Sequence, residues 1–421
     1  MVGEWRAIKL GDVCMKIGSG ATPRGGSDVY LESGPYTLIR SQNVYNDGFH
    51  HDGLAYIGEK HAAELDGVEV LKADVLLNIT GDSVARACQV DPRVLPARVN
   101  QHVAIIRPDP NRLDPRFLRY FLVSPEMQLK LLSWAGSGGT RNALTKGMIE
   151  SFDVLAPEDI SEQRAIAHIL GALDDKIELN RRMSETLEAM ARALFKSWFV
   201  DFDPVRAKME GRDTGLPPAL AALFPDRLVD SELGEIPEGW EVASLGNLLE
   251  LAYGKALKAE DRRGGSIPVY GSNGQVGWHN ERLVTGPGIV VGRKGNPGVV
   301  AWAATDFFVI DTAFYVVSKM RARSLHFLFH ALRTHNLASL SADSAVPGLN
   351  RNLAYMSMQT LPGQAVLDQF EKIGRSLAEQ VHVLEEESRT LAALRDTLLP
   401  KLISGELRVD DAERILGRID R

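Results

Sequence analysis

The architecture of this chain is set by the stretch Ile166-Ala-His-Ile-Leu-Gly-Ala-Leu-Asp-Asp-Lys-Ile177, whose apolar residues recur alternately four and three positions apart. A repeat of about 3.5 residues is typical of a helix that packs along a second helix in a coiled coil. The same spacing returns 204 positions later, with Leu377 in the place of Leu173 and Val381 in the place of Ile177. The sequence therefore predicts two long helices that pack against each other.

Each predicted helix carries one stripe of inward-facing residues, which we call the seam. The polar residue Asn180 interrupts the first seam, and such a residue tends to fix the register of the pair at some cost in stability. About 40 residues would give each helix a length of roughly 60 Å. The alternative is that each helix packs only on its own globular half. The predicted seam residues are Ile166, Leu170, Leu173, Ile177, Asn180, Leu187, Leu194, Leu377, Val381, Leu384, Leu391 and Leu398.

The segments that precede the two helices also resemble each other. Trp5-Arg-Ala-Ile-Lys-Leu-Gly11 returns as Trp240-Glu-Val-Ala-Ser-Leu-Gly246, and both segments contain strand-like runs between Gly and Pro turns. We therefore predict an α+β fold: two globular mixed α/β domains, separated by two long antiparallel coiled-coil helices, with a pseudo-two-fold internal repeat. The predicted boundaries are 1–157 and 238–362 for the globular domains, 158–201 and 363–408 for the helices, 202–237 for a linker and 409–421 for a tail.

The charge of the chain argues at first against nucleic acid, because its formal net charge is −7. The charge is unevenly distributed, however: 238–362 holds 12 Lys and Arg against 9 Asp and Glu, whereas 158–201 holds 6 against 9. The acidic segments are therefore not the candidate DNA-binding ones. The absence of a long apolar run and of a secretory signal predicts a cytoplasmic protein without membrane contact.

Motifs for catalysis or metal binding are not evident in the sequence. Gly271-Ser-Asn-Gly-Gln-Val-Gly277 lacks the Lys-Ser/Thr ending of a phosphate-binding loop, and no amino-methyltransferase motif is found. The adjacent His50 and His51 have no carboxylate or cysteine at a ligand spacing, and Cys14 and Cys88 are too few for a thiolate site. We therefore predict no catalytic and no metal-binding residues.

Two motifs carry a resemblance to a known family. Phe199-Val-Asp-Phe-Asp-Pro-Val-Arg206 and Leu398-Leu-Pro-Lys-Leu-Ile-Ser-Gly-Glu-Leu-Arg408, together with the repeat, resemble the specificity subunit of type I restriction-modification enzymes over nearly the whole chain. The resemblance implies two target recognition domains that each read one half of a split double-stranded DNA sequence, separated by conserved spacer helices. It also implies two modification subunits, which methylate adenine, and ATP-driven restriction subunits. S-adenosylmethionine, ATP and magnesium would then belong to those partners, and this chain would hold no cofactor.

The two predicted recognition domains differ in length and in sequence. They should therefore recognise different half-sites, so that the target would be asymmetric. By analogy with dimeric DNA readers, the centres of the half-sites would lie ~10 base pairs apart.

Candidate DNA contacts lie in loops rich in residues that can read base edges. Arg or Lys suits guanine, Asn or Gln suits adenine, and small hydroxyls suit either base. The alternative for each loop is a solvated turn, because Gly, Asn and Ser are also favoured there. Arg293 and Lys294 are the strongest candidates of the second domain. The candidates are Ser19, Thr22, Arg24, Arg40, Asn43, Gln101, Thr140, Arg141 and Asn142 in the first domain, and Lys255, Ser272, Asn273, Arg293, Lys294, Asn350 and Arg351 in the second.

Two other classes of function compete with a DNA-reading subunit. A self-contained DNA-modifying enzyme would turn over DNA without partners. A coiled-coil adaptor with protein-binding heads would bind duplex DNA weakly and without regard to sequence.

Overall fold

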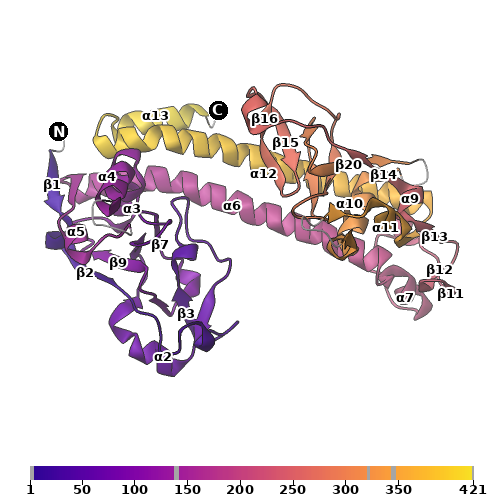
Figure 1. The fold of residues 1–421 in the computed structure, drawn as a ribbon, viewed down its shortest axis with the longest axis horizontal. Coiled ribbons are helices and arrows are strands. Elements are labelled where there is room, and N and C mark those ends of the chain that lie inside the picture. The colour runs from indigo at the N-terminus through magenta and orange to yellow at the C-terminus, as the bar shows by residue number, and fades with distance from the viewer. Residues whose placement is uncertain (1–3, 137–141, 320–322, 343–347, 420–421) are drawn as a thin grey trace. The chain divides into compact units, whose positions relative to one another are not determined.

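A computed structural model describes residues 4–136, 142–319, 323–342 and 348–419 (Figure 1). The chain divides into two compact units: unit 1 contains Met1–Glu178 and Ser388–Arg421, and unit 2 contains Leu179–Glu387. The long helices α6 (Ile160–Phe199) and α12 (Gln364–Ser404) both cross the boundary between the units. Each unit therefore contains one globular head and parts of both long helices.

The first head, residues 4–157, belongs to unit 1. Its strands form a four-stranded sheet of order β2-β9-β6-β7, a second of order β4-β3-β8-β5, and the pair β1-β10. The strands are β1 (Trp5–Lys9), β2 (Cys14–Ser19), β3 (Tyr36–Ile39), β4 (Ala55–Ile57), β5 (Glu69–Val70), β6 (Val75–Asn78), β7 (Ala87–Gln89), β8 (Ala97–Val99), β9 (Val103–Pro108) and β10 (Asp153–Pro157). The helices are α1 (Leu10–Val13), α2 (Glu59–Glu64), α3 (Pro115–Val123), α4 (Pro125–Gly136) and α5 (Lys146–Glu150).

The second head, residues 238–362, belongs to unit 2. Its sheets have the orders β14-β20-β17-β18 and β16-β15-β19, with the pairs β13-β23 and β21-β22. The strands are β13 (Glu241–Ser244), β14 (Leu249–Tyr253), β15 (Ile267–Gly271), β16 (Gly274–His279), β17 (Gly288–Gly292), β18 (Val300–Ala303), β19 (Phe308–Val309), β20 (Ala313–Ser318), β21 (Ser341–Ala342), β22 (Gly348–Leu349) and β23 (Met358–Leu361). The helices are α9 (Leu245–Leu248), α10 (Leu325–Thr334) and α11 (Arg351–Met356).

The two heads share one topology. The sheet β14-β20-β17-β18 repeats the order and the antiparallel pairing of β2-β9-β6-β7. The second sheets also correspond, because β3 pairs in parallel with β8 as β15 does with β19. The first head adds β5 to this sheet, which accounts for part of its greater length. The internal repeat predicted from the sequence is thus confirmed in the strand order.

The segment 202–237, predicted as a linker, contains secondary structure. It holds α7 (Asp203–Met209), α8 (Pro218–Ala221) and the hairpin of β11 (Leu228–Ser231) with β12 (Gly234–Pro237). The side chains of Phe202, Phe224 and Ile236 are buried in the core of unit 2. Near the end of the chain, α13 (Val409–Ile419) follows α12.

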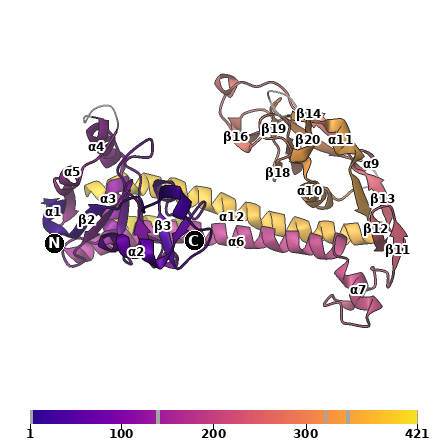
Figure 2. The same cartoon turned by 60° about the horizontal axis from the view of Figure 1, so that its bottom comes forward.

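The helices α6 and α12 run antiparallel and side by side (Figures 1 and 2). In unit 1, Asp174 of α6 accepts a hydrogen bond from Arg395 of α12 at 2.8 Å. In unit 2, Asn180 donates a hydrogen bond to Glu387 Oε2 at 2.7 Å, so the residue numbers rise along α6 while they fall along α12. Every predicted seam residue is buried or half-buried. The predicted pairing is confirmed, and the alternative that each helix packs only on its own half is wrong.

The core of unit 1 is built from both ends of the chain. Phe117 and Phe152 of the first head pack with Leu170 of α6 and with Leu398 and Leu402 near the end of α12. The core of unit 2 is strongly aromatic, since Phe195 and Phe199 of α6 contact the rings of Phe327 and Phe370. Each head thus packs on a stretch of both long helices, so each core contains residues of α6 and of α12.

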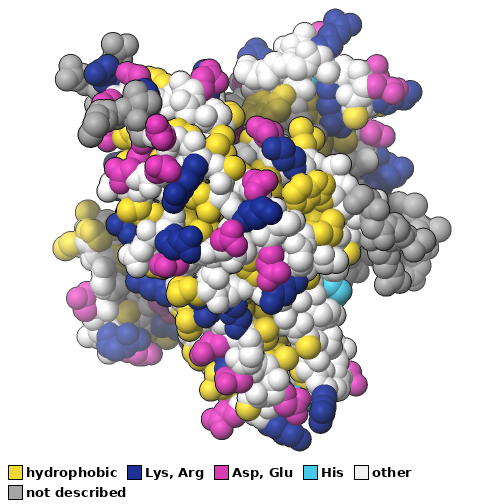
Figure 3. Space-filling view, turned by 90° about the vertical axis from the view of Figure 1, so that its left-hand side faces the viewer, with side chains coloured by type: hydrophobic (Ala, Val, Ile, Leu, Met, Phe, Trp, Pro, Cys, Tyr) yellow, Lys and Arg dark blue, Asp and Glu magenta, His cyan; other side chains and the backbone are white. Residues whose placement is uncertain are grey.

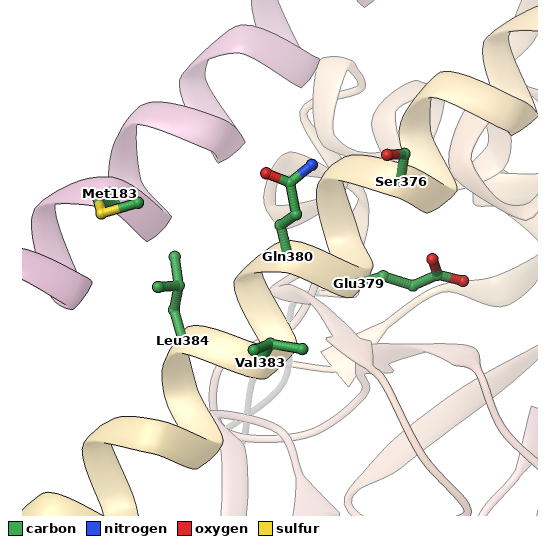
Figure 4. A pocket seen from close by; sticks show the side chains of 6 residues that line it. All are labelled: Met183, Ser376, Glu379, Gln380, Val383 and Leu384. Carbon is green, nitrogen blue, oxygen red and sulfur yellow. The ribbon is translucent and has the colours of Figure 1, made fainter. Parts of the chain in front are cut away.

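A groove of about 300 Å³ lies on the helix pair within unit 2. In Figure 4 the side chain of Leu384 points from α12 toward α6, where Met183 lies at the edge of the groove. Met183 and Val383 are exposed by 44% and 64%. The remaining lining residues are Ser376, Glu379 and Gln380 of α12. In the described part of the chain, no helix is both long and apolar enough to span a membrane.

We predict that unit 2 loses stability between about pH 6.5 and pH 4, because His330 is buried in its aromatic core. Burial lowers the pKa of His330 to about 4, and the nearby Arg333 acts in the same direction. An unfolded histidine has a pKa near 6.5, so below that pH the unfolded chain takes up a proton that the folded chain does not. The free energy of unfolding should fall by up to about 3 kcal/mol across this window.

The measurement is urea unfolding at pH 7.5, 6, 5 and 4.5, comparing the chain with His330→Gln. The free energy of unfolding should depend less steeply on pH in the variant, whatever the stability of the variant at pH 7.5. The slope that remains should come partly from His326 and His335, whose pKa values burial also lowers. Equal slopes in the two proteins would contradict the assignment to His330.

Candidate nucleic-acid interface

The predicted loops of each head meet at one end of its four-stranded sheet. In the first head, Ser19 at the end of β2 pairs with Ala104, and Asn78 at the end of β6 pairs with Val103. In the second head, Tyr253 pairs with Phe314, and Gly292 pairs with Ala313. We call this the loop end of each head. It comprises 19–24, 40–42, 78–80, 100–102 and 142 in the first head, and 253–255, 271–273, 292–294, 310–312 and 348–351 in the second.

Parallel strands bring a second pair of loops to the same end. The N–H of Asn100, after β8, donates to the carbonyl of Ile39 at the end of β3 at 3.0 Å. In the second head, the N–H of Ile310, after β19, donates to the carbonyl of Tyr270 in β15 at 2.9 Å. The loops that begin at Arg40 and Ser272 therefore lie beside those after β8 and β19.

A glycine allows close backbone contact at the same place in each head. A Cβ atom at Gly20 would lie 1.7 Å from the carbonyl oxygen of Val99, and one at Gly254 would lie 2.2 Å from that of Ile310. Any side chain at either position would force the loops apart. At Gly20 and Gly254 the backbone of these loops is therefore packed against a neighbouring loop.

In the first head a chain of neutral hydrogen bonds joins four side chains. The hydroxyl of Thr22 donates to Gln101 Oε1 at 2.7 Å, and Gln101 Nε2 donates to His102 Nε2 at 2.9 Å. His102 Nδ1 then lies 2.5 Å from the Thr80 hydroxyl. Thr22 and Gln101 are exposed, so they present a hydroxyl and an amide to solvent.

Arg40 and Asn43 lie in one loop but differ in accessibility. Arg40 is half-buried: Nη2 donates to the carbonyl of Gly53 at 2.5 Å, and Cζ lies 5.4 Å from the centre of the Tyr30 ring. Asn43 is 0% exposed, and its Nδ2 donates to the carbonyls of His50 and Asp52. The prediction that Asn43 reads a base is therefore corrected: its amide holds its own loop together.

The other candidates of the first head are surface residues. Ser19, Arg24 and Asn142 are exposed. The backbone carbonyl of Asn142 accepts a hydrogen bond from the N–H of Gly81 at 3.3 Å, which attaches its segment to the loop end. Thr140 and Arg141 lie outside the described residues.

In the second head, two arginines stack on one tyrosine. The Cζ atoms of Arg293 and Arg351 lie 4.8 and 4.9 Å from the centre of the Tyr253 ring. Arg293 Nη1 also donates to the carbonyl of Asp311 at 2.9 Å, and Arg351 Nη1 donates to that of Leu251 at 3.3 Å. The structure thus brings together two predicted residues that are 58 positions apart.

Further cations and amides surround this stack. Lys255 and Lys294 are exposed, and their backbone N–H groups donate to the carbonyls of Val309 and Thr312. Ser272 is half-buried, and Asn273 accepts a hydrogen bond from Asn296. Both loop ends contain cations, because Arg24 and Arg40 lie in the first, but only the second has two arginines on one aromatic ring.

Asn350 is a helix cap. Its Oδ1 accepts hydrogen bonds from the N–H groups of Asn352 at 3.1 Å and Leu353 at 3.3 Å, at the start of α11. In the first head, Thr145 caps α5 at the corresponding position. Asn350 is half-buried, and Asn is favoured at a cap for this same hydrogen bond, so its contact with DNA stays a prediction.

Elsewhere the surface charge is mixed. On the face shown in Figure 3, Lys and Arg side chains are interspersed with Asp and Glu. His50 lies 3.0 Å from Asp47, and His51 lies 2.9 Å from Asp91, so each histidine is paired with a carboxylate. Among the residues that the structure describes, no three His, Cys, Asp or Glu side chains are grouped as a metal site.

Comparison with known proteins assigns the family. A family model described as the type I restriction modification DNA specificity domain matches residues 3–189 and 237–353, which is more than half of the chain. The chain belongs to this family. The first matched segment covers the first head and the second covers most of the second head, in agreement with the repeat.

One similar protein of known class spans nearly the whole chain, and another spans about two thirds of it. The type I restriction enzyme HindI specificity subunit of Haemophilus influenzae is 25% identical, covering 96% of this chain and 100% of its own. The MjaIX specificity subunit of Methanocaldococcus jannaschii is 24% identical over 69% of each chain. The crystal structure of a type I S subunit from M. genitalium has the same fold, with a TM-score of 0.59 and 16% identity over 95% of this chain and 96% of that one.

As a DNA specificity subunit, the chain recognises DNA and leaves catalysis to other subunits. Sequence reasoning missed two residues of the loop ends, Tyr253 and Thr80. Tyr253 occupies the position of Ser19, an equivalence that the strand registers show. Thr80 had no local signal, because its contact with His102 depends on the pairing of β6 with β9.

Proposed function

We propose that this specificity subunit reads a split, asymmetric DNA target, with one head for each half-site. The observation that carries the proposal is that the same loop end occurs in both heads with different side chains. Thr22 and Gln101 offer a hydroxyl and an amide, whereas Arg293 and Lys294 offer cations. Arginine and lysine suit guanine and phosphate, whereas amides suit adenine, so the half-sites should differ.

We further propose that the paired helices act as the spacer between half-sites and as the place where partners bind. The proposed partners are two modification subunits and the restriction subunits, which would supply S-adenosylmethionine, ATP and magnesium in the cytoplasm. Exposed apolar side chains on the helix pair support partner binding, since such groups gather at protein interfaces. They are Leu179, Met183, Met190 and Val383.

The experiment is to map methylated adenines in a host that carries the modification partner, with and without this gene. A gapped two-part motif that disappears when the gene is deleted is the expected result. Methylation by the purified chain alone would support a self-contained enzyme. Sequence-indifferent DNA binding in the presence of the partner would support an adaptor, and either outcome would overturn the proposal.

We predict that Arg293→Ala with Lys294→Ala weakens recognition of one half-site only. A base-specific contact contributes about 1 to 3 kcal/mol of discrimination, so methylation of the target should fall about tenfold or more. The measurement is the initial rate on a library in which each half-site is randomised separately. Arg282→Ala with Arg333→Ala removes the same charge from exposed positions of this head outside the loop end and should leave the preference unchanged. If both double variants behave alike, bulk charge accounts for the effect and the site assignment is wrong.

A further inference from the structure

Tyr253 is a large aromatic residue that is exposed at the end of the edge strand β14. Its side chain is 50% exposed, while its β14 neighbours Leu249 and Leu251 are buried. The ring also contacts that of Phe314, with centroids 5.0 Å apart, so it is supported from within the head. Tyr253 is therefore a fixed aromatic surface at the loop end.

The guanidinium of Arg293 is held in place from several sides. It lies on the Tyr253 ring, and Nη1 donates to the carbonyl of Asp311 at 2.9 Å. Its backbone N–H donates to the carbonyl of Thr312 at 2.9 Å. A Cβ atom at the preceding Gly292 would lie 2.3 Å from the carbonyl oxygen of Asn296, so the chain is tightly packed there. A planar guanidinium fixed on an aromatic ring loses little side-chain entropy when it binds a planar partner.

The corresponding positions of the first head have different chemistry. The shared strand register places Ser19 where the second head has Tyr253, and Ile79 where it has Arg293. The stack is thus a property of one head, although both heads have the same topology. It should affect the reading of one half-site and leave the other unchanged.

We propose that Tyr253 is a positioning residue that orients Arg293 to read a guanine in the half-site of the second head. Arginine binds the O6 and N7 atoms of guanine with two parallel hydrogen bonds, which requires its plane to be fixed. Arg351, on the same ring, contacts the DNA backbone and carries no base preference. This inference rests on the proposed function, and it names the base and the residue that orients its reader.

The test measures methylation by the complete complex with the modification partner, on targets randomised in the second half-site. The wild-type chain should prefer guanine at one position. Tyr253→Leu should lower that preference on the order of tenfold, because the guanidinium loses its stacking surface. Tyr253→Phe, which keeps the aromatic ring, should retain the preference for guanine. Arg293→Lys keeps the charge but lacks the two-pronged geometry, so it should also lose the preference.

Preference is a ratio of rates within one sample, so it does not depend on how much of a variant folds. Arg351→Ala should slow methylation equally for all second half-sites. It should also make DNA affinity depend less steeply on salt, by the slope that about one phosphate contact contributes. Ser19→Ala, at the equivalent position of the first head, should leave the second half-site preference unchanged. A gapped motif with equal guanine preference in Tyr253→Leu and wild type would overturn this inference alone. The lack of any gapped motif would overturn the proposed function itself.

Discussion

Lengthening both long helices by one heptad is expected to move methylation to DNA targets whose gap is about three base pairs longer. The change duplicates residues 181–187 of α6 together with the opposing 377–383 of α12. A heptad adds about 10.5 Å of helix, and base pairs stack about 3.4 Å apart. Because seven residues preserve the 3.5-residue repeat, both seams stay in phase. The original target should lose methylation almost completely.

The assay is a DNA library that carries every gap length between the two half-sites. All gap lengths are needed because a longer spacer also turns the second half-site around the duplex, which has about 10 base pairs per turn. Duplicating the heptad in only one helix is the control, since it misaligns contacts such as that of Asn180 with Glu387. This control should abolish activity on all gaps. An unchanged gap in the doubly lengthened chain would show that the helices are not the spacer.

Replacement of Asp174 by alanine should strongly destabilise unit 1. Its carboxylate accepts hydrogen bonds from Arg119 and Tyr120 of α3, both at 2.7 Å, and from Arg395 of α12 at 2.8 Å. The Asp174 side chain is only 16% exposed, and that of Arg119 only 7%. Asp174→Ala would leave two largely buried guanidiniums without this anion. Removing one partner of a buried ion pair typically costs about 3 to 5 kcal/mol, so we expect unfolding to become easier by about 3 kcal/mol.

The neighbouring Asp175 offers a matched control. Its side chain is 68% exposed and pairs with Arg116, so Asp175→Ala should cost less than about 1 kcal/mol. The two variants are compared by urea unfolding at pH 7. Burial raises the pKa of Asp174, but Arg119, Arg395 and Tyr120 outweigh burial and lower it overall. The stabilisation is therefore present above about pH 4 and is lost as the pH falls through the lowered pKa. Equal losses in both variants would contradict the buried network.

This network and the loop ends serve different tasks in the same head. Asp174 connects α3 of the first head to α6 and α12, so the head is attached to the helix pair by charge as well as by apolar packing. The loop end of that head contains the exposed Thr22 and Gln101. Side chains at the loop end can therefore vary without loss of the attachment. This separation explains how two heads of one topology can carry different recognition chemistry.

The sequence by itself determined the two long helices, their pairing and the repeat of the heads. The helices follow from local periodicity: a residue such as Leu173 lies on the seam because of its spacing from its neighbours along one helix. The repeat of the heads follows from the match between Trp5–Gly11 and Trp240–Gly246. The position of the candidate loops at glycine-rich turns could also be predicted. The predicted register role of Asn180 agrees with its hydrogen bond to Glu387, in the partner helix.

Only the tertiary structure decided which polar side chains are available to DNA. Asn43 has the amide that suits adenine, but the same amide also suits the inside of a loop, and only the fold shows that Asn43 is buried there. No sequence motif marks Tyr253, because its two arginines come from the loop after β17 and from α11, 40 and 98 residues away, and contact it only when the head folds. Helix periodicity is local in the chain, whereas a binding surface is assembled from distant segments, so its members can be identified only after the strands are paired.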